Sequence, residues 1–168
     1  GAMLATSLGI VGASMHIVMH AFGKITLFFC AGAIYTAAHK SEISQMNGLG
    51  RVMPITFGAF LIGALSVIGL PPAGGAWSKL FLALGAAQAG HWLVIGALMI
   101  SSLLNVVYLM APVVRGFFAQ PPDGAMQAGM AEAPLPSLIA IVITATGCLV
   151  LFFAADPIYH AMTTLLAQ

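Results

Sequence analysis

Residues 63–85 read Gly63-Ala-Leu-Ser-Val-Ile-Gly-Leu-Pro-Pro-Ala-Gly-Gly-Ala-Trp-Ser-Lys-Leu-Phe-Leu-Ala-Leu-Gly85, an apolar run that a cluster of glycines and prolines interrupts. Pro71 and Pro72 cannot donate backbone hydrogen bonds, and the neighbouring glycines permit non-helical conformations. A helix that enters this stretch must therefore stop near Leu70. A second helix can begin near Ala76, so the sequence predicts a broken helix.

Lys79 falls in the first turn or so of that second helix, with apolar residues on both sides. A charge in such surroundings is costly unless it faces protein or water. Lysine can also exchange a proton when its surroundings change, which suits it to proton transfer. We therefore take Lys79 as a candidate functional residue.

The composition indicates an integral membrane protein. The chain has 168 residues, of which 61% are hydrophobic and 5% charged, and its mean hydropathy is +1.06. Such a chain has too little polar surface for a soluble protein. The net charge of +1 and the lack of a basic patch argue against nucleic-acid binding.

We expect an all-α fold, a polytopic membrane helix bundle with about four crossings, one of them discontinuous. Residues 1–168 should form a single membrane domain. The expected crossings are residues 8–38, residues 54–89 broken at 70–75, residues 91–118 and residues 137–155. The chain opens on Gly1-Ala-Met without a preceding initiator Met, which favours a piece of a longer polypeptide, although a cloning scar would look the same.

The arms of the interrupted segment could form one broken crossing or a hairpin of two short crossings. If they form one crossing, Lys40, Arg51 and Arg115 all lie on one side of the membrane. Cytoplasmic loops are enriched in such residues, so one broken crossing is favoured. The linkers 39–53 and 119–136 should then share the cytoplasmic face.

A ladder of titratable side chains runs along the first crossing. His16, His20 and Lys24 recur at intervals of four, which places them on one stripe of a helix. A lone membrane histidine most simply bonds a carbonyl of the next helix. Three such groups at this spacing instead favour a proton relay, because each is expensive to bury and histidine titrates near neutrality.

The remaining polar groups and the cysteines are interpreted as structural. Asp156 should be an interface or capping group of a short tail helix, and Cys30 and Cys148 should be buried and unpaired. Groups expected to form interhelical hydrogen bonds are Ser101, Ser102, Asn105 and Tyr108. Asn105 could alternatively line a water path.

Three ordered motifs carry a resemblance to a known family. They are His16-x3-His20-x3-Lys24 followed by Leu27-Phe28-Phe29 and Gly32, then Gly48-Leu-Gly-Arg-x-Met-Pro54, then Gly69-Leu-Pro-Pro-x-Gly-Gly-x-Trp-Ser-Lys79. Together they resemble the C-terminal half of antiporter-like membrane subunits. These occur in Mrp-type sodium/proton antiporters, whose D-type component is similar, in respiratory complex I and in membrane-bound hydrogenases. The resemblance covers residues 1–118 well and the tail loosely.

The resemblance implies proton translocation in a multisubunit complex, with Na+ as a further candidate cation. Lys79 matches the lysine of the family's second discontinuous helix, and Lys24, His20 and His16 match the preceding helix that links two half-channels. The implied partners are sister membrane subunits and lipid, in the inner (plasma) membrane of a bacterium or archaeon rather than an organelle. No cofactor or metal is expected. Ala76 replaces the family's usual aromatic residue, which affects local packing.

Two other functions stay open at this point. The chain could be a non-conducting structural subunit of the same kind of complex, although two lysines and two histidines are costly to bury for that role alone. It could also be a transporter of another class, but the sequence shows no second broken helix. Whether it serves an oxidoreductase or an antiporter is undecided, and it carries no redox chemistry of its own.

Overall fold

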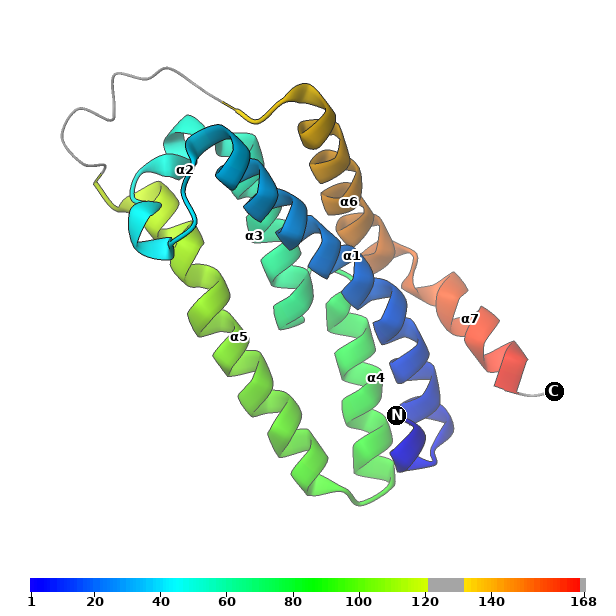
Figure 1. Cartoon of the computed structure of the whole chain (residues 1–168). Coiled ribbons are helices and arrows are strands. Elements are labelled where there is room, and N and C mark those ends of the chain that lie inside the picture. The colour runs from blue at the N-terminus through cyan, green and yellow to red at the C-terminus, as the bar shows by residue number, and fades with distance from the viewer. Residues whose placement is uncertain (121–131, 167–168) are drawn as a thin grey trace.

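The computed structural model describes residues 1–120 and 132–166, and the regular elements in these ranges are all helices (Figure 1). The predicted all-helical class is confirmed. The α-helices are α1 (Ser7–Ala38), α2 (Leu49–Val52), α3 (Pro54–Ile68), α4 (Gly75–Gln88), α5 (Trp92–Phe118), α6 (Leu135–Phe153) and α7 (Ala155–Leu166), with 3-10 turns η1 (Ala2–Leu4) and η2 (Ile43–Gln45).

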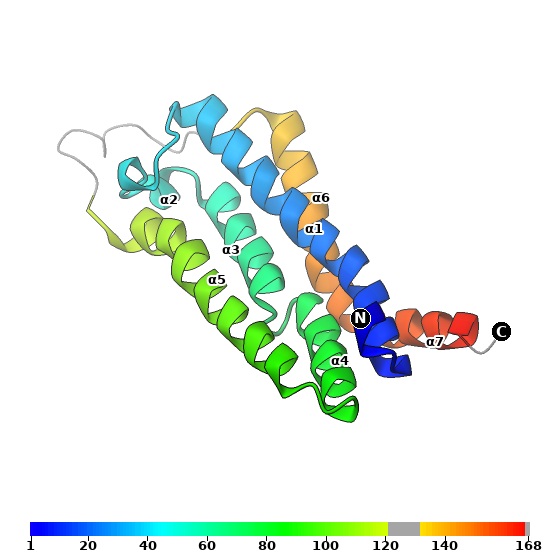
Figure 2. The same ribbon diagram turned by 60° about the horizontal axis from the view of Figure 1, so that its bottom comes forward.

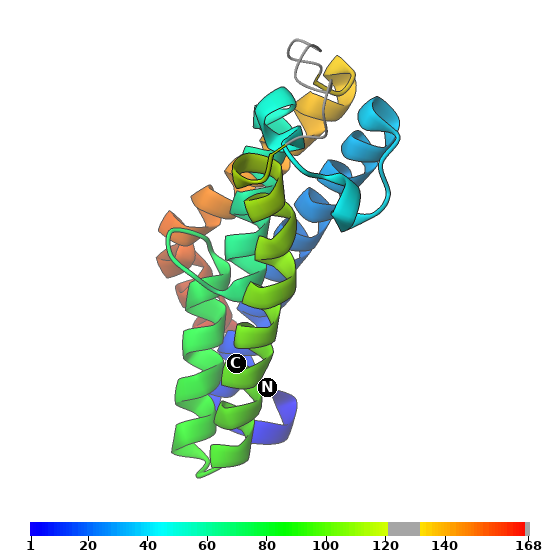
Figure 3. The ribbon, with the colours of Figure 1, turned by 90° about the vertical axis from the view of Figure 1, so that its left-hand side faces the viewer.

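The discontinuous helix consists of α3 and α4, which follow one another along the bundle in Figure 1. α3 ends at Ile68 and α4 begins at Gly75, within two residues of the expected break. Gly69 ends α3 in the left-handed conformation, with φ of 90°, which glycine adopts without steric cost. Figure 3 shows the non-helical segment bulging from the side of the bundle.

α1 lies at the centre of the bundle and packs against α3, α4, α6 and α7, while α5 runs along α3 and α4. The main core contains the fully buried side chains of Cys30, Phe57 and Ile141, which come from α1, α3 and α6. Helices α1, α5 and α6 are each long and apolar enough to cross a membrane, and α3 is a shorter apolar helix. With α3 and α4 in series, these elements make the polytopic bundle that the sequence predicts.

Small residues let the backbones of α1 and α4 approach closely. A Cβ added at Gly12 of α1 would lie 2.7 Å from the backbone nitrogen of Leu82 in α4. A Cβ added at Gly85 would lie 2.6 Å from the Cα of Gly9. Both distances are far below van der Waals contact, so glycine is required at this helix crossing. Such close crossings of small residues are typical of membrane helices.

The described parts of the two polar linkers lie at one end of the bundle, near α2 in Figure 1. The Gly48 N–H donates to the Arg115 carbonyl over 3.0 Å, and the Arg51 Nε donates to the Phe117 carbonyl over 3.0 Å. These bonds join the first linker to the end of α5, and residues 121–131 of the second linker lie outside the described residues. That both linkers share one membrane face, and that this face is cytoplasmic, stays a prediction.

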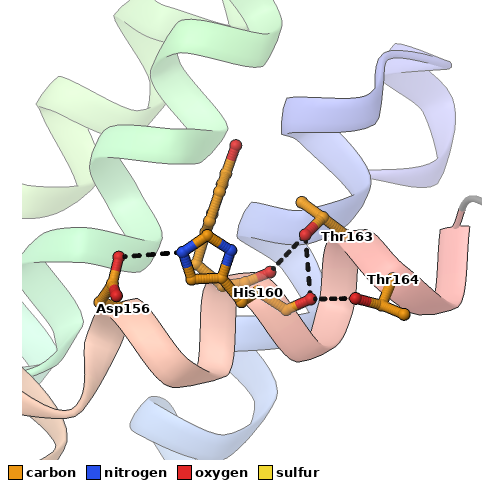
Figure 4. Close-up of polar contacts among 5 residues, drawn as sticks. Asp156, His160, Thr163 and Thr164 are labelled. Atoms are coloured by element: carbon orange, nitrogen blue, oxygen red, sulfur yellow. Dashed lines mark hydrogen bonds and ion pairs between the residues drawn. The ribbon is translucent and has the colours of Figure 1, made fainter.

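Helix α7 turns away from the axis of α6, as Figure 2 shows. Asp156 lies in its first turn, where a carboxylate interacts favourably with the helix dipole. Its Oδ1 is 3.6 Å from the Nε2 of His160 one turn later, and both side chains are exposed (Figure 4). Asp156 thus occupies the helix-start position expected from the sequence.

Candidate functional site

Lys79 bridges the break in the discontinuous helix. It lies in the second turn of α4, and its Nζ donates to the Ile68 carbonyl over 2.8 Å and to the Ser102 Oγ of α5 over 2.8 Å. Ile68 is the last residue of α3, so its carbonyl has no partner further along that helix. The lysine therefore replaces a hydrogen-bond donor that is missing because the helix is interrupted. It also joins α4 to both α3 and α5.

Gly69 makes room for the lysine side chain. A Cβ at this position would lie 2.6 Å from the Cδ of Lys79 and 3.3 Å from its Cε. Glycine is therefore favoured at position 69 for two separate reasons. Its φ is positive, and the side chain of Lys79 occupies the place of a Cβ atom. The glycine lets the aliphatic part of Lys79 cross the break and reach Ile68.

The start of α4 is attached to α6. The Gly74 N–H donates to the Cys148 carbonyl over 3.0 Å, and the Trp77 Nε1 donates to the Phe152 carbonyl over 3.1 Å. The first of these bonds satisfies a group that a helix start leaves without an intrahelical partner. Together they fix the position of α4 just before Lys79.

Two of the three ladder residues on α1 contact each other, and one of them contacts α4. The rings of His16 and His20 are stacked, with centroids 5.1 Å apart and an interplanar angle of 28°. The Nδ1 of His16 is 2.8 Å from the Oγ of Ser78, the residue before Lys79. Ser78 is fully buried and also donates to the Gly75 carbonyl over 3.1 Å. The ladder thus joins the broken helix one residue away from Lys79.

Ser78 is a site residue that the sequence did not reveal. Its signal was its place in the Trp-Ser-Lys segment, because neighbouring residues on a helix point about 100° apart. With Lys79 directed at α3 and α5, Ser78 is turned toward α1. Sequence spacing alone could not show which helix lies on that side.

Lys24 lies one turn beyond His20 and is exposed on the surface of α1. It continues the stripe that His16 and His20 occupy on this helix. The structure therefore joins His20 to His16 and His16 to Ser78, the residue before Lys79. Lys24 stands at the outer end of the same stripe.

The predicted hydrogen-bonding groups of α5 differ in their roles. Ser102 forms the expected interhelical bond, to Lys79. Asn105 and Tyr108 instead bond each other along α5, with the Tyr108 hydroxyl donating to the Asn105 Oδ1 over 2.7 Å, and Ser101 is exposed. The three-residue spacing of Asn105 and Tyr108 places them on one face of a helix, which explains this local bond.

The cysteines are buried and unpaired, as predicted. Cys30 and Cys148 are both free thiols in the core, and the Sγ of Cys148 is 3.8 Å from the Thr26 Oγ1. Among residues 1–120 and 132–166, no cluster of three or more His, Cys, Asp or Glu side chains could hold a metal ion.

Fold and site together define a helical membrane protein with a discontinuous helix and a lysine at the break. Irregular backbone inside a membrane is tolerated only beside protein or water, and broken helices of this kind are general to ion-coupled transporters. A family model described as NADH:quinone oxidoreductase/Mrp antiporter, TM, matches residues 1–105. The chain belongs to this family.

The sequence is also similar to individual proteins of this kind. The chain is 35% identical over 162 residues to NADH-quinone oxidoreductase subunit N of Desulforudis audaxviator, covering 90% of this chain and 32% of the relative. It is 30% identical over 164 residues to the D component of the Na(+)/H(+) antiporter of Alkalihalophilus pseudofirmus, covering 95% and 32%. It is 37% identical over 102 residues to NADH-quinone oxidoreductase subunit L of Rickettsia bellii, covering 61% and 16%. The chain spans about a third or less of the length of these relatives.

Proposed function

We propose that this chain forms the proton-conducting part of a membrane subunit in a multisubunit antiporter or redox-driven pump. Protons are the proposed substrate, Na+ is a further candidate, and the proposed location is the inner (plasma) membrane beside sister subunits and lipid. The family and the names of the relatives support this function. The main structural support for this function is the hydrogen bond that the Lys79 Nζ donates to the Ile68 carbonyl at the C-terminal end of α3.

In the proposed path, protons move along Lys24, His20 and His16 through ordered water. The stacked histidines and the contact between His16 and Ser78 support this order. A hydroxyl both accepts and donates hydrogen bonds, so Ser78 can take part in passing a proton between α1 and α4. Lys79 then exchanges protons with one membrane face as its surroundings alternate between hydrated and dry.

Coulombic repulsion provides the coupling in this proposal. Protonating one member of a chain of nearby basic groups disfavours protonation of its neighbours. His20 stacks on His16, and His16 contacts Ser78, the residue before Lys79. A proton that arrives at one end can therefore eject a proton at the other.

Substitution of Lys79 tests the proposal in the complete complex reconstituted into vesicles. Lys79→Ala removes both charge and carrier, so proton transport should fall to background while the complex still assembles. Lys79→Arg keeps the charge but does not release its proton, so it should also fail. The matched control is Lys40→Ala, which removes an exposed lysine of the first linker and should transport normally.

The ladder variants extend the same measurement. Lys24→Ala should be nearly as severe as Lys79→Ala, whereas water can bridge the gap left by His16→Ala and give a milder loss. Transport by Lys79→Arg at the parent rate would show that Lys79 releases no proton during the cycle. Normal transport by all these variants would favour a non-conducting structural subunit.

A further inference from the structure

The first turn of α3 has no local capping side chain. Its N-cap position is Met53, whose side chain forms no capping bond, and Pro54 occupies the first turn. Glu132, which lies 77 residues after Ile55, supplies the missing acceptor: the Ile55 N–H donates to its Oε1. The Thr56 hydroxyl donates to the other oxygen, Oε2, over 2.7 Å. Hydrogen bonds to an ionised carboxylate at a helix N-terminus are among the stronger ones in proteins.

Glu132 stands only three residues before the start of α6 at Leu135. Through Glu132, the N-terminal end of α6 holds the start of α3. Further along, the carbonyls of Cys148 and Phe152 hold the start of α4. Helix α6 and the residues just before it therefore form hydrogen bonds to both halves of the broken helix.

The distances along the two helices match. Residues 55–68 of α3 and residues 135–148 of α6 each rise about 20 Å at 1.5 Å per residue. The two helices run in the same direction from the upper end of the bundle in Figure 1 and pack against each other. The part of α6 from its first residue to Cys148 therefore spans about the same length as α3 from Ile55 to Ile68.

We propose that Glu132 is a positioning residue that ties α3 to α6 and so sets the gap across which Lys79 reaches the Ile68 carbonyl. Its link to transport rests on the proposed function, whereas its effect on the gap does not. Glu132 is not needed to fold α3, because that helix also buries Phe57 and Ala64 completely in the core. Loss of the tether should therefore shift α3 along its axis rather than unfold it.

The gap can be measured without reference to transport. Spin labels replace two exposed side chains, Leu70 in the non-helical segment directly after α3 and Leu84 on α4. In the full-length subunit within its complex, the parent should give one narrow distance distribution. Glu132→Ala should broaden and shift it. Glu132→Gln should largely restore it, because an amide oxygen still accepts from Ile55 and the amide nitrogen can donate to Thr56.

Two further variants sharpen the test. Thr56→Val removes one of the two bonds at nearly constant shape and should give an intermediate distribution. Glu42→Gln is the matched control, since Glu42 is an exposed linker glutamate whose carboxylate accepts from the Ser44 hydroxyl, two residues away. It should leave the distribution unchanged. Transport per assembled complex should fall several-fold in Glu132→Ala.

The outcomes separate this inference from the proposed function. An unchanged label distance in Glu132→Ala would overturn the positioning role, whatever happens to transport. So would a loss confined to the amount of assembled complex, with normal distance and normal transport per complex. A changed distance with normal transport would uphold the tether but count against Lys79 as the carrier at the break.

Discussion

Gly69 is the residue on which the geometry of the break depends most directly. It ends α3 with a positive φ, and the side chain of Lys79 lies where a Cβ at this position would be. An L-residue in this conformation costs about 1 to 2 kcal/mol. A methyl group there would also push Lys79 away from the Ile68 carbonyl.

We predict that Gly69→Ala lowers transport strongly and destabilises the subunit by about 1 to 2 kcal/mol. Transport and thermal unfolding of the purified complex are the two measurements. Gly58→Ala on α3 is the matched control, because a Cβ at Gly58 meets nothing within 4 Å. Equal effects of the two substitutions would show that neither the backbone conformation of Gly69 nor its close contact with Lys79 is important.

The sequence predicts some residues of the site but not their partners. Lys79 stands out because a charge within an apolar run needs a reason, and the four-residue spacing places His16 and His20 on one stripe. The carbonyl that Lys79 meets depends on where α3 ends and how α4 is offset from it. Glu132 is harder still to predict, since nothing near it in the sequence indicates a bond to Ile55, 77 residues earlier.

At the scale of elements, the crossing of α1 and α4 decides whether His16 reaches Ser78. The backbones come together at Gly12 and Gly85. We predict that Gly12→Ala forces the helices apart and destabilises the subunit by about 1 to 3 kcal/mol. It should also weaken transport by separating His16 from Ser78.

Denaturant or thermal unfolding of the complex measures the first effect, and vesicle transport the second. Gly96→Ala on α5 is the control, because a Cβ at Gly96 meets nothing within 4 Å and alanine favours a helix over glycine. If Gly12→Ala were as stable as Gly96→Ala, the two helices would have room to spare at this crossing.

The helices themselves were largely predictable. Pro71, Pro72 and the surrounding glycines place the break, because they remove hydrogen-bond donors and permit turns. Hydropathy indicates the long helices. The close contact of α1 with α4 was not predictable, since glycines such as Gly12 and Gly85 serve equally well at turns and at helix crossings.

At the scale of the whole molecule, the exposed position of Lys24 is energetically unfavourable for a helix that crosses a membrane. It stands on the surface of a 32-residue apolar helix, where contact with lipid would be unfavourable for a cation. We infer that protein or water covers this face of α1 in the assembled protein.

A nitroxide label at Lys24→Cys tests this in the assembled complex. Oxygen dissolved in lipid should collide with it rarely, because the label faces protein or water. Collision rates as high as those at a lipid-facing reference position would contradict the prediction. The native cysteines should interfere little, since Cys30 and Cys148 are buried.

The double attachment of α6 also limits how its length can vary. Its start is tied to α3 through Glu132, and its later carbonyls are tied to α4 at Gly74 and Trp77. One inserted residue would turn everything after it by about 100° and move it by about 1.5 Å. The carbonyls that Gly74 and Trp77 reach would then face the wrong side of the helix. Side chains on the outer surface of α6 can change freely, but the number of residues between its anchors cannot.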